Sequence, residues 1–184
     1  LTLIEQCVSR LDTFIRNMID YYKNSRAEEV YEAIDFNVLG NTVIDGLRNH
    51  DAAIRFELEV RQLSEFYGDA MRLQVVLNNL ISNAIKYQKS EGEDRYVRLT
   101  VDAGHESALI RVSDNGIGIS EDHLENIFKL FFRTENSQGR QGTGIGLYIV
   151  KESVEKMGGT IQVYSSPGEG TTFEIAISNK KNPI

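Results

Sequence analysis

The stretch IRVSDNGIGIS, residues 110–120, decides how the rest of this chain is interpreted. Its first four residues alternate apolar and polar side chains, which is typical of a half-buried strand. Asp114 then supplies a single carboxylate, and Gly116 and Gly118 follow directly. A flat ligand with an exocyclic amine can donate to such a carboxylate and lie against backbone that carries no side chains. The stretch therefore predicts a ligand site at the end of a strand.

The same residues also fit a hairpin, because Asp-Asn-Gly between apolar runs is a common turn signal. The residues after Gly118 favour a helix start instead of a returning strand. Ser120 is a typical N-cap residue, and Glu121 and Asp122 suit the first turn of a helix. We therefore expect a strand, a turn and a short helix here, while the ligand site and the plain turn both stay open from these residues alone.

Composition limits the function classes. The chain has 184 residues, 41% hydrophobic and 26% charged, which suits one domain with a real core plus an accessory segment. A net charge of -7 argues against a general nucleic-acid partner. The single cysteine, Cys7, excludes a disulfide framework within the chain and favours a reducing compartment, so we expect a cytoplasmic location. No run reaches the roughly 18 apolar residues of a membrane span, so we expect no membrane contact by this fragment.

Residues 1–24 carry a heptad stripe that predicts a long helix in need of a partner helix. The stripe consists of Leu1, Ile4, Val8, Leu11, Ile15, Met18 and Tyr22. We expect a homodimer or a bundle through this helix, and the alternative is a helix packed on its own domain. The polar residues 23–29 predict a domain boundary that divides the chain into residues 1–28 and 29–184. The chain opens with Leu1 and not Met, so we expect a fragment of a longer protein, and its membrane attachment stays open.

The next elements are expected from periodicity. We predict a short strand at residues 33–36, a helix capped by Asn37, and a strand at residues 54–60 with one buried face. The apolar face of that first helix is predicted to hold Val38, Val43, Ile44 and Leu47.

Residues 69–88 predict a long helix with two asparagines on one face. Asn79 and Asn83 lie four residues apart, and Lys86 and Tyr87 follow about a turn later. Amide oxygens suit Mg²⁺ as ligands, and a lysine is a point charge for a phosphate. The alternative is a solvated polar stripe, although asparagine is a poor helix former and therefore an unusual choice for one.

The second half predicts a hairpin of strands at residues 96–101 and 108–113, and later strands at residues 160–165 and 172–177. Between them, Phe128, Phe131 and Phe132 are interpreted as the hinge of a mobile lid that covers residues 134–141. The sequence GTGIGL, residues 142–147, fits neither the dinucleotide fingerprint nor the Walker loop. It does place bare backbone amides at the start of a helix, which is an anion site on physical grounds. Thr171 opens the last strand with a hydroxyl within reach of the same ligand, directly or through water.

Taken together, five ordered motifs resemble the N, G1, F, G2 and G3 boxes of sensor histidine kinases, within the ATPase superfamily of gyrase, the heat-shock chaperone and MutL. The motifs are Asn79…Asn83…Lys86-Tyr87, Asp114…Gly116…Gly118, Phe128…Phe131-Phe132, Gly142-Thr143-Gly144-Ile145-Gly146-Leu147, and Gly168-Glu169-Gly170-Thr171-Thr172-Phe173. Resemblance spans residues 33–178. Residues 1–24 resemble the second helix of the dimerisation hairpin that precedes such a kinase domain.

The resemblance implies an α/β two-layer sandwich, with a mixed, mainly antiparallel sheet packed on three helices and ATP held between helices and lid. Asp114 would accept from the adenine amine, beside Gly116, Gly118 and Thr171. Asn83, with Asn79, would hold Mg²⁺. The phosphates would be contacted by Lys86, Tyr87, Gly142, Thr143, Gly144, Gly146 and Leu147, and by Arg133 and Arg140 as weaker candidates.

The implied reaction transfers the γ-phosphoryl group of ATP to a histidine, with Asn79, Asn83 and Lys86 as its catalytic residues, and then onward to an aspartate of a response-regulator receiver domain. His50, His105 and His123 do not lie in the acceptor motif of the family, so we expect the acceptor outside this fragment and no autophosphorylation by it alone. Two alternatives stay open: a hydrolytic ATPase of the same superfamily, in which a glutamate would stand at position 79, and a nucleotide-binding dimerisation module without catalysis.

Overall fold

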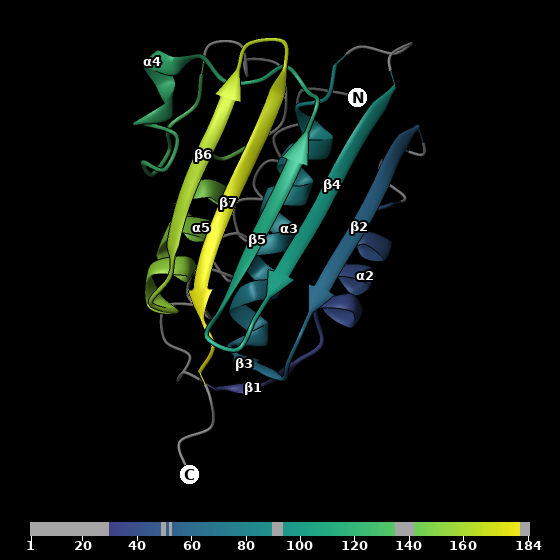
Figure 1. The fold of residues 1–184 in the computed structure, drawn as a ribbon. Coiled ribbons are helices and arrows are strands. Elements are labelled where there is room, and N and C mark those ends of the chain that lie inside the picture. Colours follow the sequence, from purple (N-terminus) through teal and green to yellow (C-terminus); the bar gives the residue numbers. More distant parts are fainter. Residues whose placement is uncertain (1–29, 49–50, 52, 90–93, 135–141, 181–184) are drawn as a thin grey trace, which may run out of the picture.

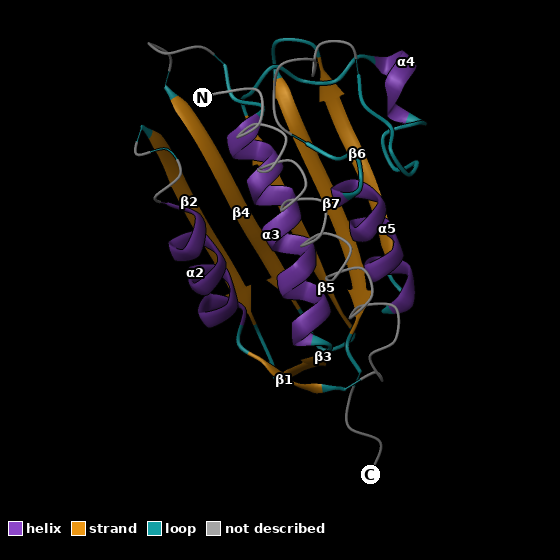
Figure 2. Cartoon of the chain, turned by 180° about the vertical axis from the view of Figure 1, so that it is seen from behind, coloured by secondary structure: helices purple, strands orange, loops and turns teal. Residues whose placement is uncertain are grey.

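The described part of the chain folds as a two-layer sandwich in which three helices cover a five-stranded main sheet. The computed structural model describes residues 30–180 apart from residues 49–50, 52, 90–93 and 135–141. Five strands form the main sheet in the order β2-β4-β5-β7-β6. Only β2 and β4 pair in parallel, and the other neighbours are antiparallel. Helices α2, α3 and α5 cover one face of this sheet (Figures 1 and 2). The mixed, mainly antiparallel sandwich expected from the sequence is confirmed.

The element boundaries are as follows. In chain order they are β1 (Glu32–Ile34), α2 (Phe36–Leu47), β2 (Ile54–Gln62), β3 (Phe66–Gly68), α3 (Ala70–Lys86), β4 (Arg95–Ala103), β5 (Ser107–Asp114), α4 (Glu121–Leu124), α5 (Gly146–Lys156), β6 (Thr160–Ser166) and β7 (Gly170–Ser178).

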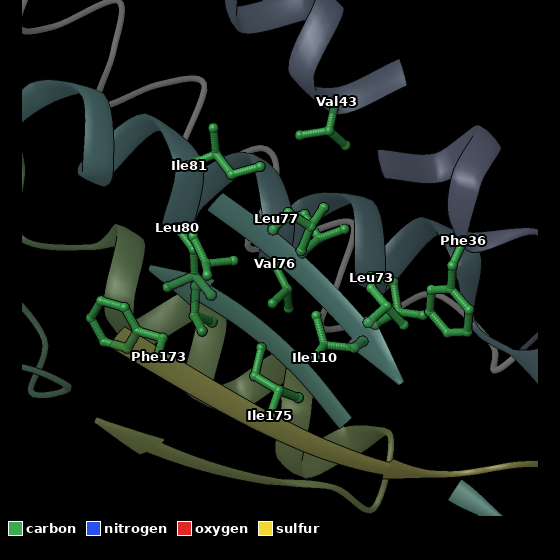
Figure 3. Close-up of a cluster of buried hydrophobic side chains, with 14 of the residues drawn as sticks. Phe36, Val43, Leu73, Val76, Leu77, Leu80, Ile81, Ile110, Phe173 and Ile175 are labelled. Atoms are coloured by element: carbon green, nitrogen blue, oxygen red, sulfur yellow. The ribbon is translucent and has the colours of Figure 1, made fainter. Parts of the chain in front are cut away.

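The core lies between α3 and the middle of the sheet. Helical spacing places Leu73, Leu77 and Leu80 on one face of α3, and all three are buried. Strand alternation turns Ile110 of β5 and Ile175 of β7 toward them, and both are fully buried (Figure 3). This packing fixes α3 across β5 and thereby sets the polar face of α3 relative to the end of β5.

The region of α2 corrects three expectations. Phe36 was expected in a strand but begins α2 and is buried at 1% exposure, against Phe66 with ring centroids 5.2 Å apart. The cap is Asp35 and not Asn37, because Oδ1 of Asp35 accepts from the amides of Asn37 (2.8 Å) and Val38 (3.1 Å). The Val38 side chain is 62% exposed, so it does not belong to the buried face.

The strands at the sheet edge agree with expectation in part. The strand predicted at residues 54–60 is present as β2, and its alternating face packs on the core: Ile54 is buried, whereas Phe56, Leu58 and Val60 are partly buried because β2 lies at an edge of the sheet. Strand β3 was not expected; its three residues are too few for a periodicity signal. They pair antiparallel with β1 in a separate small sheet.

Helix starts in the second half differ in detail. Ser120 is the N-cap residue of α4 as predicted, with Glu121 and Asp122 in the first turn, but its side chain makes no capping hydrogen bond. The spacing of Leu147, Val150, Val154 and Met157 in the sequence predicts the apolar face of α5, and all four pack on the core; Ile149, which this spacing omits, is buried as well at 0% exposure. A helix and not a strand follows Gly118, so the plain hairpin interpretation of the Asp-Asn-Gly turn is excluded.

Several expectations lie outside the described residues. These are the heptad helix of residues 1–24, the position of His50, Arg140, and almost all of the expected lid. Among the described helices, none combines the length and apolar character that a membrane crossing requires.

Candidate functional site

A cavity of about 570 Å³ opens between α3, the start of α5 and the turn that follows β5. Its walls bring together nearly all of the residues singled out in the sequence. The predicted residues that line it are Asn79, Asn83, Lys86, Tyr87, Asp114, Gly118, Arg133, Gly142, Thr143, Gly144, Gly146, Leu147 and Thr171. Gly116 does not line the cavity, but its amide holds the carboxylate of Asp114, which does.

Asp114 is the acidic group of this wall, held by backbone amides. The Gly116 amide donates to Asp114 Oδ1 at 2.8 Å, and the amide of Thr171 donates to the same carboxylate. Burial raises the pKa of Asp114 to about 6, against these two amides, which lower it. A carboxylate that burial disfavours gains most from a ligand that donates a hydrogen bond to it.

The turn after Asp114 is clamped on both sides by backbone. A side-chain carbon on Gly116 would lie 2.4 Å from the carbonyl oxygen of Tyr87, at the end of α3. The amide of Ile117 donates to that same carbonyl at 3.0 Å. On the other side, Gly118 has φ +69°, and a side-chain carbon there would lie 2.0 Å from the carbonyl oxygen of Ser166. Both glycines are therefore required by close approach of the backbone.

The side chain of Asn115 continues the hydrogen bonding to the β4 side of the sheet after the backbone of β5 has ended. The β4–β5 register ends at Val97 opposite Asp114. Beyond it, the Asn115 carboxamide accepts from the amide of Tyr96 at 2.9 Å and donates to the carbonyl of Asp94 at 2.6 Å. The side chain thus satisfies backbone groups that β5 no longer reaches, and it ties the base of the Asp114 turn to β4.

The polar face of α3 forms the opposite wall, with Asn79 and Asn83 both on it. Asn79 Nδ2 donates to the carbonyl of Val75 at 2.8 Å, which orients its carboxamide. Asn79 Oδ1 then lies beside Gly146, where a side-chain carbon would approach it to 2.8 Å. Two amide oxygens are hard ligands that suit Mg²⁺. Among the described residues there is no cluster of three or more His, Cys, Asp or Glu for a metal.

Two cations face the start of the glycine-rich stretch. Lys86 Nζ donates to Tyr87 Oη at 2.9 Å, and it occupies the space that a side-chain carbon on Gly142 would need, at 2.2 Å. Arg133 Nη1 donates to the carbonyl of Gly142 at 2.9 Å. The end of α3 and the segment before the expected lid therefore place positive charge beside the same backbone, as a polyphosphate would require.

The amino end of α5 completes this part of the cavity. None of the described side chains caps the helix, and its first turn lacks acidic residues, so its amides and dipole are suited to an external anion. Gly144, at φ +72°, accepts from the amide of Phe131 at 3.0 Å. Phe131 itself has φ +64° and a 59% exposed side chain, so it is not a buried anchor, whereas the Phe132 ring packs on His123 at 5.8 Å between centroids.

Sequence reasoning missed most of the apolar wall. The further lining residues include Ile117, Ile119, His123, Ile127, Phe132, Thr134 and Phe173, with Leu47, Asn78 and Ser82 on the side of α2 and α3. The alternation of Ile117 and Ile119 with glycines was the available signal, because an isoleucine beside a turn glycine is positioned to cover a flat ligand. Nothing in the local pattern indicated Leu47, which comes from a helix distant in sequence.

A family model with the description "Histidine kinase-, DNA gyrase B-, and HSP90-like ATPase" matches residues 68–181, which include every cavity residue except Leu47. The chain belongs to this ATPase family. Within it, the chain is a catalytic ATP-binding domain of the sensor histidine kinase type, as its relatives and structural neighbours are named.

One such relative is the sensor protein GacS of Pseudomonas syringae pv. syringae, which is 36% identical over 189 residues, covering 97% of this chain and 21% of that protein. The cyanobacterial phytochrome B of Nostoc sp. is 32% identical, over 97% of this chain and 24% of that protein. The chain thus spans about a fifth of the length of such curated relatives.

Among solved structures, the catalytic domain of the histidine kinase ThkA matches with a TM-score of 0.69 and 27% identity, covering 82% of this chain and 98% of that one. Full-length ShkA in complex with AMPPNP matches with a TM-score of 0.78 and 25% identity, covering 95% of this chain and 37% of that one.

Proposed function

We propose that this ATPase-family domain transfers the γ-phosphoryl group of Mg-ATP to a histidine outside the chain, for relay to an aspartate of a response-regulator receiver domain. The observation that carries the proposal is the cavity that joins the Asp114 turn to Lys86 and the amino end of α5. One end of it suits a purine amine and the other a polyphosphate.

In this proposal the adenine amine donates to the Asp114 carboxylate, while Gly118 and Ile117 leave room for the flat ring. The lysine Lys86 and the α5 amides from Gly146 onward balance the charge of the phosphates. Phosphoryl transfer depends mainly on positioning and charge neutralisation, which are the contributions these groups can make.

A magnesium ion fits the residues present. Asn83 and Asn79 would hold it with their amide oxygens, and it would neutralise phosphate charge when bound. The orientation of Asn79 by its own i−4 carbonyl supports this role, since an oriented carboxamide presents a fixed oxygen. The net charge of -7 makes a divalent cation favourable for a chain that receives a triphosphate.

The acceptor histidine is proposed to lie elsewhere in the parent protein. His105 is in the β4–β5 connection at the other end of β5 from Asp114, and His123 packs edge-on against Phe132 in α4. Neither lies on a long exposed helix as the acceptor of this family would. His50 lies outside the described residues.

The hydrolytic alternative is not favoured. A hydrolytic enzyme of the superfamily needs a carboxylate at position 79 to activate water, and the Asn79 amide cannot accept a proton. Of the proteins reported above, GacS is named as a sensor protein and ThkA as a histidine kinase. Dimerisation through the helix of residues 1–24 and a cytoplasmic location remain part of the proposal, supported by the heptad stripe and the single cysteine.

The test uses nucleotide binding and label transfer together. Calorimetry should show magnesium-dependent ATP binding to the chain, and Asp114→Ala or Asn83→Ala should abolish it. Incubation with γ-labelled ATP should leave no stable label on the chain alone, whereas the full-length parent should label itself, and neither variant of it should. Stable label on His50, His105 or His123 would contradict the acceptor assignment, and rapid multiple-turnover phosphate release would favour hydrolysis.

A further inference from the structure

Three residues in register across β6, β7 and β5 form one row beneath the cavity. Ser165 pairs with Thr171, and Thr171 pairs with Asp114. Directly opposed residues of neighbouring strands point to the same face of a sheet, so the three side chains lie side by side. Thr171 and Asp114 line the cavity, whereas Ser165 stands behind Thr171 and does not line it.

The Ser165 hydroxyl makes three contacts, and their chemistry is unequal. The amide of Ile119 lies 2.8 Å from Ser165 Oγ, the carbonyl oxygen of Gly170 lies at 2.7 Å, and Thr171 Oγ1 lies at 2.9 Å. An amide nitrogen can only donate and a carbonyl oxygen can only accept. The hydroxyl of Thr171 is the partner that is able to do either.

The hydroxyl of Ser165 has one proton to donate and two acceptor positions, which sets the direction of the third bond. Ser165 donates its hydrogen bond to the Gly170 carbonyl and accepts one from the Ile119 amide. Its remaining acceptor position can therefore only accept a hydrogen bond from Thr171. The proton of Thr171 is therefore directed away from the cavity, and its oxygen presents lone pairs alone.

We infer that Ser165 is a positioning residue for purine selectivity: by holding the proton of Thr171, it makes the cavity present acceptors to the purine 6-position and so selects 6-amino over 6-oxo purines. The inference rests on the proposed ATP site. A 6-amino group can donate to the Asp114 carboxylate and to Thr171, directly or through water. A 6-oxo group meets lone pairs on both, which is repulsive.

The buried position of Thr171 limits how its hydroxyl can adapt to a different ligand. Thr171 is 7% exposed, and its own backbone amide bonds the Asp114 carboxylate. A mismatched ligand therefore has little room to rotate the hydroxyl or to recruit water in its place. Sites built to hydrogen-bond one group reject the analogue that cannot reciprocate more strongly than apolar pockets do.

The experiment compares ATP with ITP, its 6-oxo counterpart, on the 184-residue chain at pH 8, where Asp114 is ionised. We expect wild-type chain to bind ATP more tightly than ITP by about 100-fold or more. In Ser165→Ala the Thr171 hydroxyl is released and can donate to a 6-oxo group. The ratio of the two Kd values should then fall about tenfold, which equals the effect of a single hydrogen bond of roughly 1.4 kcal/mol.

The controls separate selectivity from structure. Ser166→Ala, at the exposed neighbouring position, should keep the wild-type ratio. Ser165→Ala also leaves the Ile119 amide without its hydrogen-bond partner. This loss should weaken the binding of ATP and of ITP equally, so it should not change the ratio of their Kd values. In a Thr171→Val background, Ser165→Ala should have no further effect on the ratio. Ser165→Cys, with its weak acceptor, provides the same comparison if the alanine variant does not fold.

An unchanged ratio in folded Ser165→Ala would overturn the inference and leave Ser165 a structural residue. Wild-type chain that binds neither nucleotide would instead contradict the proposed function itself.

Discussion

At the scale of single residues, Asp114 shows a conflict between stability and binding. Its pKa of about 6 lies above its ordinary value of 3.8, because burial disfavours the charge. Between these two pH values the folded chain holds a proton that the unfolded chain has released. The free energy of unfolding therefore falls as pH rises from about 4 to 6 and stays lowered above that window. The fold retains this carboxylate at a cost that a bound amine would offset.

Replacing Asp114 by asparagine should therefore stabilise the ligand-free chain while removing nucleotide binding. Oδ1 of the new amide can still accept from Gly116, but no charge is buried. We expect the free energy of unfolding in urea at pH 7.5 to rise by roughly 1–3 kcal/mol, with the gain lost near pH 4. Asp102→Asn, at an exposed position of β4, is the control and should change little. An equal or lower stability of Asp114→Asn at pH 7.5 would contradict the burial argument.

At the scale of elements, the turn between β5 and α4 depends on backbone contact with its neighbours. Gly118 combines a left-handed backbone with a carbonyl 2.0 Å from the place of a side-chain carbon. We expect Gly118→Ala to lower the free energy of unfolding by about 2–4 kcal/mol, because the β6–β7 connection must move away. Thermal unfolding measures the loss, and ATP binding should weaken with it.

The matched control is Gly46 in the exposed part of α2, where a side-chain carbon would meet nothing within 4 Å. Gly46→Ala should raise the free energy of unfolding by up to about 1 kcal/mol, since alanine favours a helix interior. If both alanine variants changed stability in the same direction, the turn would not be the tightly packed element described above.

Sequence patterns predicted those elements that have long and regular periodicity. The apolar spacing of α3 and the alternation of β4 and β5 indicated all three elements and their buried faces. Phe36 was misplaced because an apolar residue beside a short strand fits either element, and its contact with Phe66 decides. The parallel pairing of β2 with β4 and the existence of β3 depend on contacts between distant segments, which no local period reports.

The candidate site could be predicted where the type and spacing of single residues indicate their chemistry. Asp114, Asn83, Lys86 and the glycines stand out by type and spacing, and the cavity brings most of them together. The groups behind them were not predictable. Ser165 and Asn115 act through registered strands, and their hydrogen bonds depend on which residue lies opposite in the sheet.

At the scale of the whole molecule, the two faces of the sheet have different electrostatics. On the open face, acidic and basic side chains pair with each other, as Arg98 does with Glu57 and Arg111 with Glu174 at 2.6 Å. On the helix face, Lys86 and Arg133 lie beside the backbone of the cavity. Because two cations and the uncapped amino end of α5 meet at the cavity, it is the side of the sheet where a triphosphate is favoured.

A ligand in this cavity would contact α3, α5, β5 and β7 at once, so it should stabilise the whole domain and not one loop. Mg-ATP at 100 times its Kd should raise the free energy of unfolding by about 2.7 kcal/mol. The midpoint of thermal unfolding should then rise by roughly 5–10 °C for a domain of this size. Excess chelator with the same ATP should reduce this rise. Without Mg²⁺, the uncharged side chains of Asn79 and Asn83 cannot neutralise the triphosphate, which is then repelled by the net negative charge of the chain. Asp114→Asn should show no rise in either condition. An identical rise with and without chelator would mean that Lys86 and the α5 amides hold the phosphates unaided, and that the asparagine face of α3 has another role.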